Sequence, residues 1–285
     1  MKLSYIVATY NCPHWLDLHL ANLIEGQTDR DFEVLVVHHE SPNYDREVGE
    51  KWAAIDDRVR NLDDKDYGCY APAWIHGWKH AKGDFVVNSN TDDFHHPDFT
   101  SEFHKHMTLA TKGVLSPYPI AFGYAGMQVV REDGRMVGAG LKPAFDFELM
   151  TRECWGGPQV CWRNDDDFRQ TVDWDLMLDR AKSYHSAYDY WLWLYFLSLG
   201  YHGYVIQKIL TIYTQRDGSV ENANKWQNNW ETYASISEFF GHNFDGHLKH
   251  AREFRDFHTL PPKDKWVETM QAGKKWKRSK RGGTN

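Results

Sequence analysis

Alternating strand and helix patterns in the first ninety residues constrain the fold more than any other feature of the chain. Short apolar runs rich in β-branched and aromatic residues predict three buried strands, and periodic apolar residues between them predict three helices. The predicted strands are 3–9, 32–39 and 84–90, and the predicted helices are 11–26, 44–55 and 70–83. Such alternation produces βαβ units. The sequence therefore predicts an α/β fold, with a mostly parallel central sheet flanked by helices.

Polar residues follow each of the three predicted strands. They form three clusters: Thr9-Tyr10-Asn11, His38-His39-Glu40-Ser41, and Asn90-Thr91-Asp92-Asp93. Ligands of open α/β sheets bind beyond the carboxyl ends of the strands, so these clusters are expected to share one crevice. Three polar strand ends in one crevice are typical of a nucleotide site.

The glycine-rich loops that bind phosphate are missing from the sequence. Neither G-x-G-x-x-G after the first strand nor G-x-x-x-x-G-K-[ST] occurs. A bound diphosphate would then need another source of positive charge, and Mg²⁺ or Mn²⁺ held by Asp92 or Asp93 would supply it. The alternative is that these adjacent aspartates are ordinary turn or N-cap residues.

Four motifs occur in order along residues 2 to 220. The first is an opening strand followed by Thr-Tyr-Asn, a helix, Gln-Thr and a second strand. The others are "HGWKHAKGDFVVNSNTDD", "DYWLWLYFLSLGY" and "ILTIYTQRDGSVEN". Together they resemble the family 2 glycosyltransferases with the GT-A fold. The resemblance implies a Rossmann-like GT-A domain that transfers a hexosyl or pentosyl group from a nucleotide diphosphate donor to an acceptor hydroxyl, with inversion at the anomeric carbon. The acceptor would be a glycan, a lipid-linked sugar, a protein or a hydroxymethylated nucleic-acid base.

The same resemblance implies roles for individual residues. Asp92 would hold Mn²⁺ or Mg²⁺ against the diphosphate with support from Asp93, and Asp189 would be the catalytic base. The alternative for Asp189 is an N-cap of the helix that it opens. The residues expected to contact the nucleotide or donor are Thr9, Tyr10, Asn11, His38, Glu40, Asp66, Asn90, Thr91 and Arg216.

The chain also departs from the family pattern. His38 and His39 stand where the family usually has two aspartates, Asn90 replaces the first acid of D-x-D, and Tyr188 replaces the glutamate before Asp189. The Q-x-x-R-W motif is absent, which argues against a processive polysaccharide synthase. Arg216 lies near the position of a frequent histidine, and its guanidinium is suited to phosphate.

The acceptor is expected to dock on the aromatic, acidic segment 153–178. Trp155, Gly156 and Trp162 are the candidate residues, because tryptophan rings stack on sugars or bases. The alternative is a core or hinge role. His95 and His96 match no zinc-site spacing, so they are expected to line the donor crevice or to face solvent.

Composition and charge bound the remaining possibilities. The chain has 285 residues and a formal charge of −7. The basic segment 273–281 makes a nucleic-acid acceptor possible, and its alternative role is a solubilising terminus. We expect a donor-binding half at 1–110, an acceptor-binding and catalytic-base half at 111–220, and a helical extension with a basic tail at 221–285. No signal peptide or transmembrane run is recognisable, so a soluble, cytoplasmic protein is expected. The sequence does not indicate the oligomeric state.

Two other function classes remain open at this point. A nucleotidyltransferase would share the architecture, but it normally carries a Gly-rich first loop with Arg or Lys. A non-catalytic module that binds nucleotide-sugar or glycan would explain the departures at His38, Asn90 and Tyr188. The presence of both Asp92 and Asp189 argues against the non-catalytic module.

Overall fold

The computed structural model describes residues 3–39, 44–64, 70–150, 159–184, 186–216, 231–232, 234–236 and 238–239. These residues fall into two compact units. The first comprises the described residues up to Phe145, 159–183 and Tyr201–Arg216. The second comprises the described residues of 146–150, 184–200 and 231–239. Nearly all of the predicted extension at 221–285, with its basic tail, lies outside the described residues.

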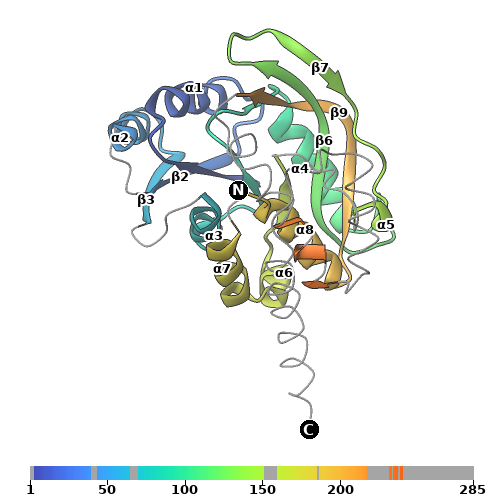
Figure 1. Ribbon diagram of the computed structural model, residues 1–285. Helices are drawn as coiled ribbons and strands as arrows, with labels where there is room; N and C mark the ends of the chain where they lie inside the picture. Colours follow the sequence, from blue (N-terminus) through green and yellow to red (C-terminus); the bar gives the residue numbers. More distant parts are fainter. Residues whose placement is uncertain are drawn as a thin grey trace, which may run out of the picture. The chain divides into compact units, whose positions relative to one another are not determined.

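The first unit is built on one sheet (Figure 1). Its strands are β1 (Leu3–Thr9), β2 (Phe32–His39), β3 (Val59–Asp64), β4 (Phe85–Asn88), β5 (Phe94–His95), β6 (Ile120–Arg131), β7 (Met136–Gly140), β8 (Cys161–Arg163) and β9 (His202–Gln215). They are arranged in the order β3-β2-β1-β4-β8-β6-β9-β5, with β7 paired to β6. The strands β3, β2, β1 and β4 are parallel, in agreement with the predicted mostly parallel sheet, although β3 itself was not predicted. The strands β6 and β9 are also parallel, whereas β5, β7 and β8 introduce antiparallel pairs.

The helices of the first unit lie on both faces of the sheet (Figure 1). They are α1 (Pro13–Ile24), α2 (Asp45–Ile55), α3 (Tyr70–His80), α4 (Phe99–Thr111), α6 (Asp166–Thr171) and α7 (Trp174–Ser183). The helix α4 lies against β6 and β9, and α7 lies against α3. Alternation along β1 explains this layering, because Tyr5 and Val7 join a core with Leu16 and Leu20 of α1, whereas Ile6 approaches α3 from the other face.

The second unit contains α5 (Phe147–Met150) and α8 (Tyr188–Ser198). The helix α8 is apolar on all sides, and it buries Tyr188 and every residue from Tyr190 to Leu197. At 11 residues it is much shorter than a bilayer span. Within the described part of the chain, no helix has the length and hydrophobicity needed to cross a membrane.

Gly77 allows α3 to pack closely on the sheet. A Cβ atom at this position would lie 2.4 Å from Ile6 Cγ2 and 3.1 Å from Val37 Cγ2. Gly77→Ala is therefore expected to destabilise the protein by about 1–3 kcal/mol through overpacking. The direction of the stability change is informative, because the same Gly→Ala change in an exposed helix would stabilise the protein by roughly 1 kcal/mol.

Urea unfolding followed by circular dichroism would measure this difference. Gly138→Ala in β7 is the control, because no described atom lies within 4 Å of its Cβ position. A Gly77→Ala protein as stable as the Gly138→Ala control would contradict the close approach of α3.

Candidate functional site

The polar strand ends predicted from the sequence lie together at one edge of the sheet. Thr9 at the end of β1 pairs in register with His38 of β2, and Ile6 of β1 pairs with Asn88 near the end of β4. Asp93 then follows β4 by five residues. The parallel pairing of β1 with both neighbours therefore brings the three clusters to the same edge.

Asp45 fixes the turn that carries the first cluster. This buried carboxylate, the first residue of α2, accepts a 2.9 Å hydrogen bond from Thr9 Oγ1 and a 3.0 Å bond from the backbone N of Cys12. The Cys12 thiol lies 3.4 Å from the hydroxyls of both Thr9 and Thr91. Asp45 was not predicted from the sequence, because an acidic residue in the first turn of a helix is usually explained by the helix dipole alone.

Tyr10 and Asn11 form the turn between β1 and α1. Asn11 has a φ of 54°, in the left-handed region that asparagine tolerates better than most residues. The Tyr10 side chain is 58% exposed. The turn therefore presents an aromatic ring to solvent at the edge where the polar clusters meet.

The two ring nitrogens of His38 have different roles, one as a donor and the other as an acceptor. Its Nε2 lies 2.7 Å from Asn61 Oδ1 and donates to it, so Nδ1 carries the lone pair. That Nδ1 is buried without a hydrogen-bond partner among the described residues. Burial lowers the pKa of His38, and the bond to Asn61 only partly offsets this effect.

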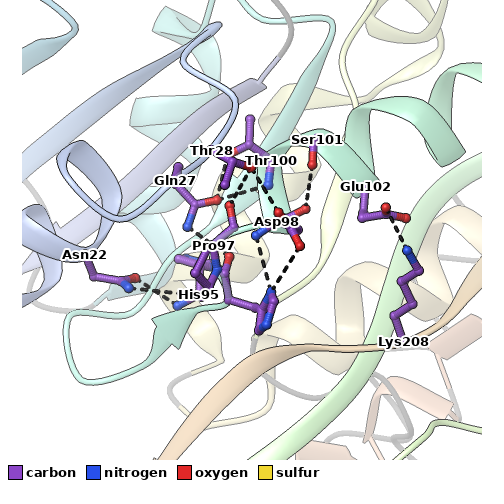
Figure 2. A network of polar contacts seen from close by, with 11 residues as sticks. Asn22, Gln27, Thr28, His95, Pro97, Asp98, Thr100, Ser101, Glu102 and Lys208 are labelled. Carbon is purple, nitrogen blue, oxygen red and sulfur yellow. Dashed lines mark hydrogen bonds and ion pairs between the residues drawn. The ribbon is translucent and has the colours of Figure 1, made fainter.

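The end of α1 holds the segment that follows the two aspartates (Figure 2). Asn22 makes two hydrogen bonds to the His95 backbone, donating to O at 3.1 Å and accepting from N at 2.9 Å. Gln27 donates to the His96 carbonyl at 3.0 Å, and Thr28 donates to the Pro97 carbonyl. The Gln-Thr pair noted in the sequence thus holds the backbone of His96 and Pro97, just after the two aspartates.

A buried chain of hydrogen bonds fixes the same segment from inside. His19 Nδ1 donates to the Asp93 carbonyl at 2.7 Å, because a carbonyl can only accept. Neutral His19 must then accept from Ser89 Oγ through Nε2 at 2.8 Å, and Ser89 accepts from His95 Nε2 at 2.7 Å. His95 is therefore a buried core residue, and the expectation that it lines the crevice or faces solvent is wrong. His96 is exposed, as expected.

Asp93 is an internal anchor. It is fully buried, Asn90 Nδ2 donates to its Oδ2 at 3.1 Å, and the backbone N of Thr214 donates to its Oδ1 at 3.1 Å. Burial, followed by the charge of neighbouring Asp92, raises the pKa of Asp93 far above its ordinary range. Both oxygens are occupied by protein donors, so this placement does not support the predicted metal role of Asp93. It also directs the Asn90 amide inward.

Asp92 has the opposite environment. Its carboxylate pairs with Arg216 at the end of β9, with 2.6 Å between Oδ2 and Nη2, and the two side chains are 18% and 30% exposed. The Arg216 guanidinium also lies over the Trp15 ring, 5.6 Å from its centroid. Two residues predicted separately from the sequence are thus in contact, and the aromatic partner from α1 was not predicted.

The residues present fit a divalent cation only in part. No group of three or more histidine, cysteine, aspartate or glutamate residues in the described ranges is arranged to hold a metal ion. Mg²⁺ and Mn²⁺, however, are commonly held by one or two carboxylates and completed by substrate phosphates and water. Asp92 fits that mode as a single partly exposed carboxylate.

Asp189 lies in the first turn of α8, in the second unit. It is the half-buried acid of a helix whose other residues from Tyr188 to Leu197 are buried. The residue that caps this helix is Ala187, without a side-chain bond. The backbone N–H groups of Ser186 and Ala187 donate instead to Glu231, at 2.7 and 2.8 Å. Asp189 is therefore not the N-cap residue, although its Oδ1 accepts a 2.8 Å hydrogen bond from the backbone N of Tyr190 within the first turn of α8.

The remaining candidates give no support to the acceptor prediction. Trp162 in β8 is fully buried and packs against Trp78 and Phe122, with ring centroids 5.8 and 5.4 Å apart. The core alternative for Trp162 is thus confirmed. Glu40, Asp66, Trp155 and Gly156 lie outside the described residues.

Comparison with known proteins identifies the fold. Residues 4–132 match the model of glycosyl transferase family 2. The chain is similar over 89% of its length to S. aureus TarS 1–349, with 72% of that chain covered, a TM-score of 0.57 and 16% identity. It is similar over 95% of its length to the mannosyltransferase PcManGT of Pyrobaculum calidifontis, with 84% of that chain covered, a TM-score of 0.56 and 15% identity. The chain has the GT-A fold. The resemblance predicted from the sequence is thereby confirmed.

A curated relative matches a shorter segment. EpsH of Bacillus subtilis (strain 168), which is provisionally named a glycosyltransferase, is 25% identical over 123 residues. The match covers 43% of this chain and 35% of EpsH, so the chain spans about a third of the length of that relative.

The buried histidines predict a pH dependence of stability. Burial lowers the pKa of His19 to about 4, from an ordinary value near 6.5. The unfolded chain therefore binds a proton that the folded chain excludes, and stability that is complete above pH 6.5 falls as the pH drops toward 4. The free energy of unfolding therefore rises with pH between about 4 and 6.5. Removing one such histidine is expected to reduce this slope by about 1.4 kcal/mol per pH unit near pH 5.

Urea unfolding of His19→Gln between pH 7.5 and 4.5 would measure this slope. His96→Gln is the matched control, because it removes an exposed histidine and leaves the buried hydrogen bonds of His19 in place. Equal slopes in the two variants would show that His19 takes up its proton in the folded state.

Proposed function

We propose that the protein is a metal-dependent, inverting glycosyltransferase that uses a nucleotide diphosphate sugar. The observation that carries the proposal is the contact between Asp92 and Arg216 at the carboxyl edge of the parallel strands of a GT-A fold. A carboxylate that would hold a cation thus lies beside a guanidinium that would bind phosphate. Two neighbours in fold support the choice of donor, because TarS was crystallised with UDP-GlcNAc and PcManGT with GDP-Man and Mn²⁺.

Different residues at this edge would bind different parts of the donor. Thr9, Tyr10 and Asn11 border the nucleotide, and the exposed Tyr10 ring can stack on a base. The Nδ1 of His38 would accept a hydrogen bond from an N–H of the nucleotide base. Thr91 lies beside Cys12 at the same edge of the sheet. Arg216 binds the diphosphate, and Asp92 would hold the cation. A divalent cation there would stabilise the negative charge that develops on the leaving diphosphate.

The chemical step needs a base for the acceptor. Asp189 takes the proton of the acceptor hydroxyl as that oxygen bonds to the anomeric carbon. The bond from the anomeric carbon to the diphosphate oxygen breaks, and the electron pair leaves with the nucleoside diphosphate. Attack from the face opposite the leaving group inverts the configuration. The acceptor hydroxyl belongs to a glycan, a lipid-linked sugar, a protein or a hydroxymethylated nucleic-acid base. The basic segment 273–281, which favours the nucleic-acid base, lies outside the described residues.

Binding of nucleoside diphosphates is expected to stabilise the protein. A thermal-shift panel of UDP, GDP, CDP, ADP and dTDP, each with and without MnCl₂, would identify the donor class. A ligand at 100 times its dissociation constant adds about 2.7 kcal/mol to the free energy of unfolding. We expect one nucleotide to raise the melting temperature, and to do so most strongly with Mn²⁺. A panel without any shift would reject the proposed donor site and favour a different function.

Asp189→Asn tests the proposed base. Hydrolysis of the matching nucleotide sugar, with water as the acceptor, is expected to fall by roughly 10²–10⁴-fold because no carboxylate accepts the proton. The nucleotide-induced thermal shift should remain. Asp175→Asn is the matched control, because Asp175 is an exposed acid in the first turn of α7. Unchanged hydrolysis in Asp189→Asn would remove this residue from the mechanism.

A further inference from the structure

The carboxylate proposed to hold the cation already has a cationic partner in the protein. Arg216 Nη2 lies 2.6 Å from Asp92 Oδ2, and both side chains are less than a third exposed. Trp15 lies beneath the guanidinium at 5.6 Å from the ring centroid. The partial burial of this pair reduces the screening that weakens ion pairs at the surface.

Backbone contacts hold the two partners of this pair in place. The strand β5 pairs with β9, with Phe94 opposite Ile212 and His95 opposite Thr211. The Thr214 amide donates to Asp93, the neighbour of Asp92. The segment that carries Asp92 and the strand end that carries Arg216 are therefore joined by hydrogen bonds that do not involve the ion pair.

A divalent cation that approaches Asp92 alone would find a poor site. Both oxygens of neighbouring Asp93 accept hydrogen bonds from the protein, and the Asn90 amide is used in one of them. The described residues contain no group of three or more metal-ligating side chains. Arg216 Nη2 lies 2.6 Å from Asp92 Oδ2, so its positive charge also repels a cation that approaches this carboxylate.

A nucleoside diphosphate would remove each of these obstacles. Its phosphate oxygens attract the guanidinium away from Asp92, because Arg binds phosphate well. The same oxygens complete the coordination shell of Mg²⁺ or Mn²⁺, which needs several oxygen ligands.

We propose that Arg216 excludes divalent cations from Asp92 until a nucleoside diphosphate binds, so that cation and diphosphate bind cooperatively. This proposal rests on the proposed donor site. Linkage requires the effect to be reciprocal, and each ligand therefore tightens the binding of the other by the same factor.

Binding of Mn²⁺ to the full chain, followed by the electron paramagnetic resonance signal of free Mn²⁺, tests the proposal. Without nucleotide, Arg216→Gln is expected to bind Mn²⁺ at least about tenfold more tightly than wild type, a factor within the usual range of coupling between sites. Lys208→Gln is the matched control. Lys208 lies on the same strand, β9, but its side chain pairs with Glu102 and not with Asp92. The Lys208→Gln variant should therefore bind Mn²⁺ as wild type does. The gain in Arg216→Gln should vanish in the double variant with Asp92→Asn.

The wild-type protein offers a second test that needs no variant. Saturating UDP, or the nucleotide selected by thermal shift, should tighten Mn²⁺ binding by about tenfold or more, and this factor should shrink in Arg216→Gln. Equal Mn²⁺ affinity of wild type and Arg216→Gln without nucleotide would overturn the proposal, as would a wild-type affinity that nucleotide does not change. Failure of every nucleotide to bind would instead reject the donor site, and the comparison made without nucleotide distinguishes the two outcomes.

Discussion

The pairing of β5 with the end of β9 is the contact on which the candidate site depends. β5 has only two residues, Phe94 and His95, yet it joins two segments that are more than a hundred positions apart in the sequence. Just beyond the paired residues, the Asp93 side chain accepts a hydrogen bond from the Thr214 amide and the Asp92 side chain contacts Arg216. A different register would place other side chains beside the two aspartates, because neighbouring residues of a strand point to opposite faces.

Two adjacent aspartates have different roles because their surroundings differ. Asp93 turns into the protein, where Asn90 and the Thr214 amide satisfy both of its oxygens. Asp92 stays partly exposed and faces a cationic side chain. Burial without hydrogen bonds would cost several kcal/mol for a polar group, so the buried member of the pair must have protein partners. The partly exposed member is then the one left for a ligand.

The helix α1 supports this arrangement along its whole length. Trp15 in its first turn lies under Arg216, His19 holds the Asp93 carbonyl, and Asn22 near its end holds the His95 backbone. These residues follow one another at intervals of three or four, so they lie on one side of the helix. The apolar residues Leu16, Leu20 and Leu23 pack into the core from the same helix. A helix predicted only as a packing element thus also positions the site.

The sequence by itself determined the alternation of strands and helices at the amino terminus, because short apolar runs and periodic stripes are local patterns. The strands at 3–9 and 32–39 have the predicted bounds, and the predicted helix at 44–55 lies at Asp45–Ile55. It also placed the polar strand ends at one edge, since parallel strands share the direction of their carboxyl ends. The strands β3, β6 and β7 were not predicted, because their sequences mix polar residues and glycine with apolar ones. The strands β5 and β8 were not predicted either, because they have only two and three residues.

Only the tertiary structure decided which candidates touch. It brought Asp92 to Arg216, moved His95 into the core, buried Trp162 in the sheet and revealed Asp45 as the link between Thr9 and Cys12. These outcomes depend on contacts between segments far apart in the sequence. Local periodicity carries no information about such contacts, whereas strand register and burial fix them.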